Sequence, residues 1–216
     1  MNQWINKDTE IYCSFAKKAG NTGCQMMNTA FHYYGLNKIY KSFSVKIIEE
    51  AVQAVKTLGI KGFAITMPFK TKVVPLCSDW TDDVTSIGAA NTVISENGRL
   101  IAHNTDYLAA KTILDECLGI DLYILGDGGY SAAVQVAARD LGYTPNIINR
   151  DNWNTIKDIK DSIIFNCTPV ENIEVDDSND FIDCIVSTPS GKRLSWLQAS
   201  HQFKLYTNEE LTIGTI

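Results

Sequence analysis

The chain has 216 residues, of which 45% are hydrophobic and 20% are charged, and its formal net charge at pH 7 is -6. This size and composition allow a sizeable buried core in one large or two small domains. The negative charge argues against a nucleic-acid-binding surface. No apolar run reaches the roughly 18 residues of a membrane span, and Met1–Trp4 lacks the basic and then apolar pattern of a signal sequence.

Cysteine and histidine spacing gives no sign of a metal site. No two of the six cysteines stand at the short spacing of a metal or redox motif, and the three histidines fit no metal-ligand spacing either. We therefore expect reduced thiols, a cytoplasmic location and no metal. The residues concerned are Cys13, Cys24, Cys77, Cys117, Cys167 and Cys184, with His32, His103 and His201.

The first half of the chain alternates predicted strands and helices. Short apolar runs rich in aromatic and β-branched residues indicate strands, and apolar residues at helical spacing indicate helices. The expected elements are strands over 10–15, 39–43 and 61–67, and helices over 26–34 and 47–58.

The second half continues this alternation around a glycine-rich loop. Its pattern favours a small parallel sheet, and the change of motif near Asp106 predicts domains over 1–105 and 106–216. The expected elements are helices over 106–117 and 131–141, and strands over 122–125, 146–149, 163–167, 181–186 and 203–207.

Three blocks between Ala64 and Tyr107 each set a polar side chain beside an apolar run. Lys70 follows a strand that ends in a turn at a proline, Asn91 lies in Ala-Ala-Asn-Thr-Val, and Asp106 lies in His-Asn-Thr-Asp-Tyr. Each residue also has an ordinary structural interpretation: a solvated lysine, a turn-forming asparagine and a helix N-cap. Together the three blocks could furnish one active site.

The loop Gly126-Asp127-Gly128-Gly129 lies directly between a predicted strand and a predicted helix. Glycines at this position let the backbone approach a pyrophosphate, and the free N–H groups at the helix start bind the anion. The alternative is a tight turn without a ligand. At the end of the next strand, the guanidinium of Arg150 could meet a ribose 2'-phosphate, whereas the carboxylate of Asp151 would favour NAD.

Taken in chain order, these motifs resemble those of the shikimate dehydrogenase family. The blocks around Lys70, Asn91 and Asp106 are similar to the family's Thr-x-Pro-x-x-Lys strand end, Ala-x-Asn-Thr turn and Asn-Thr-Asp helix start. Several further segments keep the family's order. They are Asn28 and Phe31 with Gly35, where Met27 replaces the usual histidine, then the glycine loop, Asn149-Arg150 and Asn166-Cys167-Thr168-Pro169.

Two segments resemble the shikimate dehydrogenase-like branch more than the main branch: Pro68-Phe69-Lys70 and Asn21-Thr22-Gly23. The resemblance implies an α/β fold, with an N-terminal α/β substrate domain and a small Rossmann-like parallel-sheet cofactor domain. It also implies an oxidoreductase of aromatic amino acid biosynthesis that is cytoplasmic. We expect a small-molecule substrate and no nucleic-acid or membrane partner. The resemblance is also compatible with a homodimer.

The implied reaction is hydride transfer between NADP, with NAD as the alternative cofactor, and 3-dehydroshikimate or a similar hydroxy ring acid. Lys70 and Asp106 would be catalytic, and Thr66 and Asn91 would orient ring hydroxyls. Asn21 and Gly23 stand at the positions of two serines that bind the substrate carboxylate. The cofactor would be held by a set of five residues in the second half, Gly126, Gly128, Gly129, Asn149 and Arg150.

The end of the chain raises a further expectation. The family usually follows its last parallel strand with a Gly-x-x-Met-Leu-x-x-Gln helix, whose glutamine touches the substrate. With a strand over 203–207, only nine residues remain for such a helix, and Gln198 and Gln202 would be exposed amides before the strand. This shortened C-terminus predicts weak or absent shikimate oxidation. The alternatives to a shikimate dehydrogenase are a low-activity or non-catalytic metabolite- or nucleotide-binding protein of the same fold, and a quinate dehydrogenase.

Overall fold

The computed structural model describes residues 5–118 and 121–212, so the Met1–Trp4 segment considered above lies outside the described residues. The chain divides into two compact units. The first combines the described residues of Met1–Thr105 and Ala199–Ile216, and the second is Asp106–Gln198. The second unit therefore begins at Asp106, where the motifs change. It ends at Gln198, whereas the predicted cofactor domain extended to residue 216.

The first unit is built on a six-stranded mixed sheet with the strand order β2-β1-β3-β5-β6-β4. The strand β1 pairs in parallel with both of its neighbours, whereas β5 runs antiparallel to β3 and to β6. Asn97 and Gly98 join β5 and β6 with positive φ angles, as a tight hairpin requires. The strands are β1 Glu10–Ala16, β2 Lys38–Ser44, β3 Gly62–Ile65, β4 Asp79–Trp80, β5 Thr92–Glu96 and β6 Arg99–His103.

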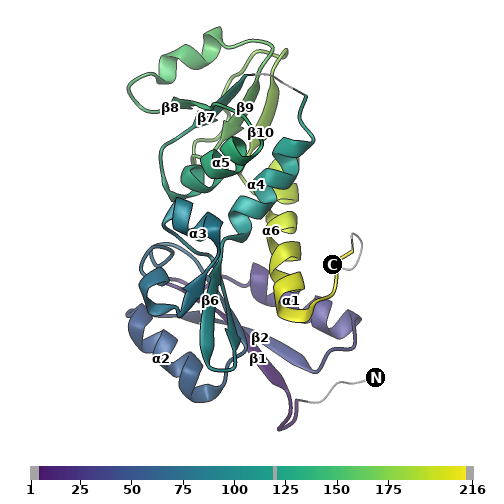
Figure 1. The fold of residues 1–216 in the computed structure, drawn as a ribbon. Helices are drawn as coiled ribbons and strands as arrows, with labels where there is room; N and C mark the ends of the chain where they lie inside the picture. The colour runs from purple at the N-terminus through teal and green to yellow at the C-terminus, as the bar shows by residue number, and fades with distance from the viewer. Residues whose placement is uncertain (1–4, 119–120, 213–216) are drawn as a thin grey trace. The chain divides into compact units, whose positions relative to one another are not determined.

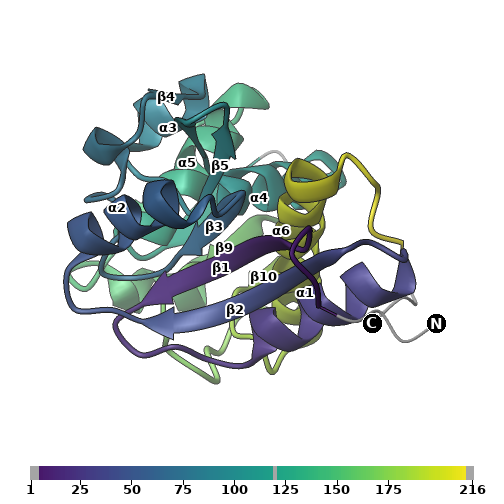
Figure 2. The ribbon, with the colours of Figure 1, turned by 90° about the horizontal axis from the view of Figure 1, so that it is seen from below.

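Helices cover both faces of this sheet (Figures 1 and 2). Helix α2 (Ile48–Leu58) packs its apolar residues against Phe15 and Phe63 on one face. Helix α1 (Thr22–Tyr33) and the end of α6 (Pro189–Thr207) meet Tyr12 on the other face. Two shorter helices, η1 Val74–Leu76 and α3 Asp82–Ile87, complete the connections.

The second unit is a parallel sheet of four strands in the order β10-β9-β7-β8. Because all four strands run the same way, their carboxyl ends form one edge of the sheet, which is where α/β folds bind ligands. The elements are α4 Thr105–Asp115, β7 Leu122–Leu125, α5 Gly129–Asp140, β8 Asn146–Ile148, η2 Trp153–Asp158, β9 Ile163–Asn166 and β10 Asp180–Asp183 (Figure 1). The predicted α/β class is thus confirmed.

The strand predicted over 203–207 is wrong, because these residues form the last turns of α6. Over the whole helix the buried residues recur at helical spacing; they are Gly191, Leu194, Leu197, Ala199, Gln202, Phe203 and Tyr206. The five-residue window Phe-Lys-Leu-Tyr-Thr alternates like a strand and is too short to reveal that period. The last strand is therefore β10, and a 19-residue helix follows it.

Within the described residues, no helix combines the length and the apolar character needed to cross a bilayer. The same residues contain no group of three or more His, Cys, Asp or Glu side chains placed to hold a metal ion.

Candidate functional site

In the first unit, the turn after β3 fixes the backbone of Lys70. The backbone N–H of Thr66 donates to the carbonyl of Phe15 at 3.1 Å, and that of Phe69 donates to Thr66 at 3.0 Å. The ring of Phe69 is only 4% exposed and anchors the turn in the core. The carbonyl of Lys70 then accepts a bond from the N–H of Ala90 at 2.9 Å. The half-buried Lys70 and the exposed Thr66 are therefore held beside the segment that carries Asn91.

Asn91 is 4% exposed and is bound on both sides of its backbone. Its backbone N–H donates to the backbone carbonyl of His103 at 3.1 Å, and its backbone carbonyl accepts a bond from the N–H of Ile65 at 2.8 Å. The side-chain oxygen Oδ1 accepts bonds from the backbone N–H of Thr105 at 2.8 Å and from the Thr105 hydroxyl at 3.0 Å. Because a backbone N–H can only donate, these contacts identify the oxygen of the Asn91 amide. They also fix the start of α4, where Asp106 is the next residue.

The predicted carboxylate-binding residues lie at the start of α1. Asn21 precedes the helix without capping it through its side chain, and Gly23 lies in the first turn; both are exposed. Asn28 has a structural task in the same helix. Its amide nitrogen donates to the carbonyl of Tyr40 at 2.8 Å, and its oxygen accepts the Tyr40 N–H at 2.9 Å, which ties α1 to the edge strand β2.

In the second unit, the glycine loop lies at the carboxyl end of β7. Gly126 has a φ of 99°, and a Cβ added there would approach the methyl carbon of Thr168 to 2.7 Å. A Cβ added at Gly128 or Gly129 would meet no atom of the described residues within 4 Å. No side chain among the described residues caps the start of α5, so its first N–H groups remain available for an anion. This open, uncapped loop fits a pyrophosphate.

The segment after β8 displays Arg150 on a fixed turn. The N–H of Asn149 donates to Asn152 Oδ1 at 2.7 Å, and Asn149 Oδ1 accepts the N–H of Asp151 at 2.8 Å. Asn149 is therefore occupied in shaping the turn. Arg150 is exposed, and within residues 5–118 and 121–212 it forms no ion pair. Its guanidinium is thus available to a phosphate, although the exposed carboxylate of Asp151 is next to it in sequence.

The sequence analysis missed the helix motif expected after the last strand. Gly191 and Gln198 in α6 have the spacing of Gly-x-x-Met-Leu-x-x-Gln, with Leu194 and Ser195 in place of Met and Leu. The geometry requires the glycine, because a Cβ at Gly191 would lie 2.0 Å from the carbonyl oxygen of Ile185. The expectation that this helix is missing is therefore wrong. The absence of the helix can no longer serve as the reason for expecting weak shikimate oxidation. The spacing alone could have revealed Gln198.

The expected site residues are thus divided between the two units. Those placed in the first unit are Asn21, Gly23, Thr66, Lys70 and Asn91. Those placed in the second unit are Asp106, Gly126, Gly128, Gly129, Asn149 and Arg150, together with Gln198. Each set lies with its own sheet. The turn after β3 and the start of β5 bring Lys70 close to Asn91, and the carboxyl edge of the parallel sheet carries both the glycine loop and Arg150.

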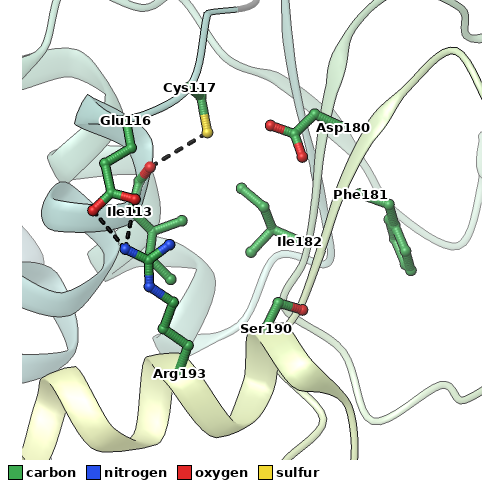
Figure 3. A pocket seen from close by; sticks show the side chains of 8 residues that line it. All are labelled: Ile113, Glu116, Cys117, Asp180, Phe181, Ile182, Ser190 and Arg193. Atoms are coloured by element: carbon green, nitrogen blue, oxygen red, sulfur yellow. Dashed lines mark hydrogen bonds and ion pairs between the residues drawn. The ribbon is translucent and has the colours of Figure 1, made fainter. Parts of the chain in front are cut away.

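A separate cavity of about 210 Å³ lies in the second unit among α4, β10 and α6 (Figure 3). Arg193 and Glu116 form an ion pair at its side, and the thiol of Cys117 donates to the carbonyl of Ile113 at 3.3 Å. Burial, reinforced by the carboxylate of Asp180, raises the pKa of the Cys117 thiol to about 12. A neutral thiol is a poor nucleophile and a poor metal ligand. We therefore expect the Cys117 thiol in this cavity to be mostly protonated at neutral pH.

Cys117 is expected to react with a soluble aromatic disulfide at pH 8 at least about tenfold more slowly than a free cysteine, because little thiolate exists at that pH. Since the other cysteines also react, the rate for Cys117 is the difference between the parent protein and Cys117→Ser. The rate should keep rising with pH through pH 10. A plateau below pH 9 would contradict the raised pKa.

The sequence and the structure of the chain were compared with those of known proteins. Residues 22–93 match the family model for the shikimate dehydrogenase substrate binding domain. A shikimate dehydrogenase-like protein from Haemophilus influenzae is 34% identical over 142 residues, which are 64% of this chain and 52% of that protein. A shikimate dehydrogenase (NADP(+)) from Pyrococcus furiosus is 32% identical over 149 residues, 67% of this chain and 54% of its own length. The chain thus spans about half the length of these curated relatives.

A solved structure of a shikimate 5-dehydrogenase-like protein superimposes with a TM-score of 0.88 at 26% identity, covering 98% of this chain and 96% of the other. The agreement therefore extends over both units, beyond the segment matched by the family model. The resemblance to the shikimate dehydrogenase family predicted from the motifs is thus confirmed by the family model over residues 22–93, by these relatives and by the fold, and the similar proteins include a shikimate dehydrogenase-like protein.

Proposed function

We propose that the protein catalyses reversible hydride transfer between NADP and the ring carbonyl of 3-dehydroshikimate or a similar hydroxy ring acid. The observation that carries this proposal is the set Thr66, Lys70 and Asn91, which occupies the family's motif positions and is fixed by backbone hydrogen bonds at one end of the first sheet. The open glycine loop of the second unit supports the cofactor part of the proposal. A relative named as an NADP(+) enzyme supports the choice of cofactor.

In this mechanism, Lys70 acts as the acid. A nicotinamide cofactor, when bound, would supply or accept the hydride. As the ring carbonyl becomes an alkoxide, the protonated amine of Lys70 stabilises the negative charge and delivers the proton. Asp106 accepts a hydrogen bond from a ring hydroxyl.

The remaining polar groups orient the ring acid. Thr66 offers a hydroxyl, and Asn91 offers its amide nitrogen, because its oxygen is bound to Thr105. At the start of α1, Asn21 can donate from its side chain and Gly23 from its backbone to the substrate carboxylate, a position where the helix dipole favours an anion. The amide of Gln198 is assigned to the substrate by its place in the helix motif.

The deciding experiment follows NADPH and NADH oxidation with 3-dehydroshikimate, with oxo acids that lack the ring hydroxyls as controls. The proposal requires turnover with the ring acid, a preference for NADPH, and little or no turnover with the controls. If NADPH binds but no ring acid is turned over, the protein is instead a binding member of the family. Absence of binding of either cofactor would remove the assignment of the glycine loop.

Arg150→Ala is expected to weaken NADPH binding about tenfold while leaving NADH binding nearly unchanged, because only NADPH carries the 2'-phosphate that a guanidinium would bind. Calorimetric titration of both cofactors measures the two affinities. Lys157→Ala, which removes another exposed positive charge from the segment after β8, serves as the matched control. Equal losses for both cofactors would refute the 2'-phosphate role.

A further inference from the structure

Gln202 is a buried amide in the part of α6 that packs on the first sheet. Its side chain is 5% exposed, although the sequence analysis expected an exposed amide. A polar group buried in an apolar layer is costly unless it forms a hydrogen bond. Gln202 meets this need through Nε2, which donates to the hydroxyl oxygen of Thr92 at 2.9 Å. The glutamine is therefore attached to the strand that follows Asn91.

The bond from Gln202 starts a chain with a defined direction. Because the oxygen of Thr92 accepts from Gln202, the Thr92 hydroxyl has its own proton to donate. It lies 3.3 Å from the hydroxyl of Thr105 and 3.1 Å from Oδ1 of Asn91. The hydroxyl and N–H of Thr105 both donate to that same oxygen. The donors of Thr92 and Thr105 thus converge on the carbonyl oxygen of Asn91, which has only two lone pairs.

This saturation determines what Asn91 can offer to a ligand. Its oxygen is occupied inside the unit. In the part of the chain that the structure describes, its nitrogen Nδ2 takes part in no hydrogen bond. Asn91 therefore presents a donor, and the group that it meets must be an acceptor such as a hydroxyl oxygen. Rotation of the amide by half a turn would set its NH₂ group against the donors of Thr105 and is disfavoured.

We propose that Gln202 is a positioning residue of the substrate site. Through Thr92 and Thr105, it holds the Asn91 amide so that its nitrogen faces the ring hydroxyl of the bound acid. Gln202 itself touches neither substrate nor cofactor. The inference rests on the proposed function for the identity of the ligand, but the hydrogen-bond network exists without it.

Steady-state kinetics with a ring acid and NADPH tests this role. Gln202→Leu keeps the volume and removes the donor, so we expect KM for the ring acid to rise about tenfold, with KM for NADPH unchanged. Thr92→Val, which removes the connecting hydroxyl, should show the same selective loss, and Thr92→Ser, which restores it, should recover most of the affinity. Gln53→Leu changes an exposed glutamine on α2 and serves as the control.

A double-mutant cycle distinguishes positioning from general destabilisation. If Gln202 acts through Asn91, Gln202→Leu should raise KM for the ring acid little further in an Asn91→Ala background. An equal rise in both backgrounds would overturn the proposal. So would a Gln202→Leu variant that loses affinity for ring acid and NADPH alike.

Nuclear magnetic resonance of the side-chain amides tests the network without requiring catalysis. The NH₂ signals of Asn91 are identified by their absence in Asn91→Ala. We expect them to shift in Gln202→Leu and Thr92→Val but to remain in place in Gln53→Leu. Unchanged signals in both network variants would overturn the proposal. If the parent protein turns over no ring acid, the proposed substrate fails, and these signals alone decide whether Gln202 positions Asn91.

Discussion

Replacement of Lys70 by alanine is expected to lower turnover by roughly 10²- to 10⁴-fold, the usual scale for a positioned proton donor. The variant would leave the developing alkoxide without a nearby cation and without a source of the proton. The backbone carbonyl of Lys70, which accepts the N–H of Ala90, remains in the variant, so the turn should persist. Steady-state turnover of the ring acid with NADPH measures the effect, and calorimetric titration should show unchanged cofactor affinity.

Lys72→Ala is the matched control for this experiment. Lys72 is exposed, lies two residues further along the same turn, and forms no ion pair within the described residues. Its removal lowers the local positive charge by the same amount without touching the proposed acid. Equal turnover in Lys70→Ala and the parent protein would remove Lys70 from the mechanism. Equal losses in the two lysine variants would show that only the charge of the turn matters.

Gly128→Ala is expected to weaken NADPH and NADH binding by roughly 10- to 100-fold, or about 1.4 to 2.8 kcal/mol, without lowering the unfolding temperature. Its backbone is extended, with φ −103° and ψ −176°, and the added Cβ would meet no atom of residues 5–118 and 121–212 within 4 Å. Since no described residue is obstructed, the loss of affinity would come from the proposed pyrophosphate site. Calorimetry and thermal unfolding together measure the two quantities.

Gly126→Ala provides the contrast. Its φ of 99° strains any other residue, and its Cβ would collide with the methyl carbon of Thr168. This variant should therefore lose both stability and cofactor binding. Thr168→Ser in the same chain removes the colliding methyl carbon and should restore part of the stability. Undiminished cofactor affinity in Gly128→Ala would place the pyrophosphate elsewhere.

The sequence by itself determined the class of fold and most of its elements. The strand over 122–125 is confirmed at both ends, and the helix predicted over 47–58 differs from α2 by one residue. Such elements have local causes, namely an apolar run of strand length or an apolar face at helical spacing. The family motifs were also recoverable, because each is a short run of residues at the end of a strand or the start of a helix.

The β5–β6 hairpin was missed, although its Asn97-Gly98 turn is a strong hairpin signal in the sequence. The secondary structure of Phe203–Thr207 could not be predicted from these five residues alone, because they alternate locally like a strand. Their helical period becomes visible only over the full length of α6.

Tertiary structure alone decided the partners of the polar side chains. Gln202 is 110 positions away from Thr92 in the sequence, and nothing in either segment indicates that the Gln202 amide will donate to the Thr92 hydroxyl. The direction of the Asn91 amide depends in the same way on Thr105, 14 residues downstream. Hydrogen bonds between distant segments depend on which faces the core brings together, and local sequence carries no record of that pairing. The sequence thus predicted most residues of the candidate site, and the folded core determined which atom Asn91 presents to a ligand.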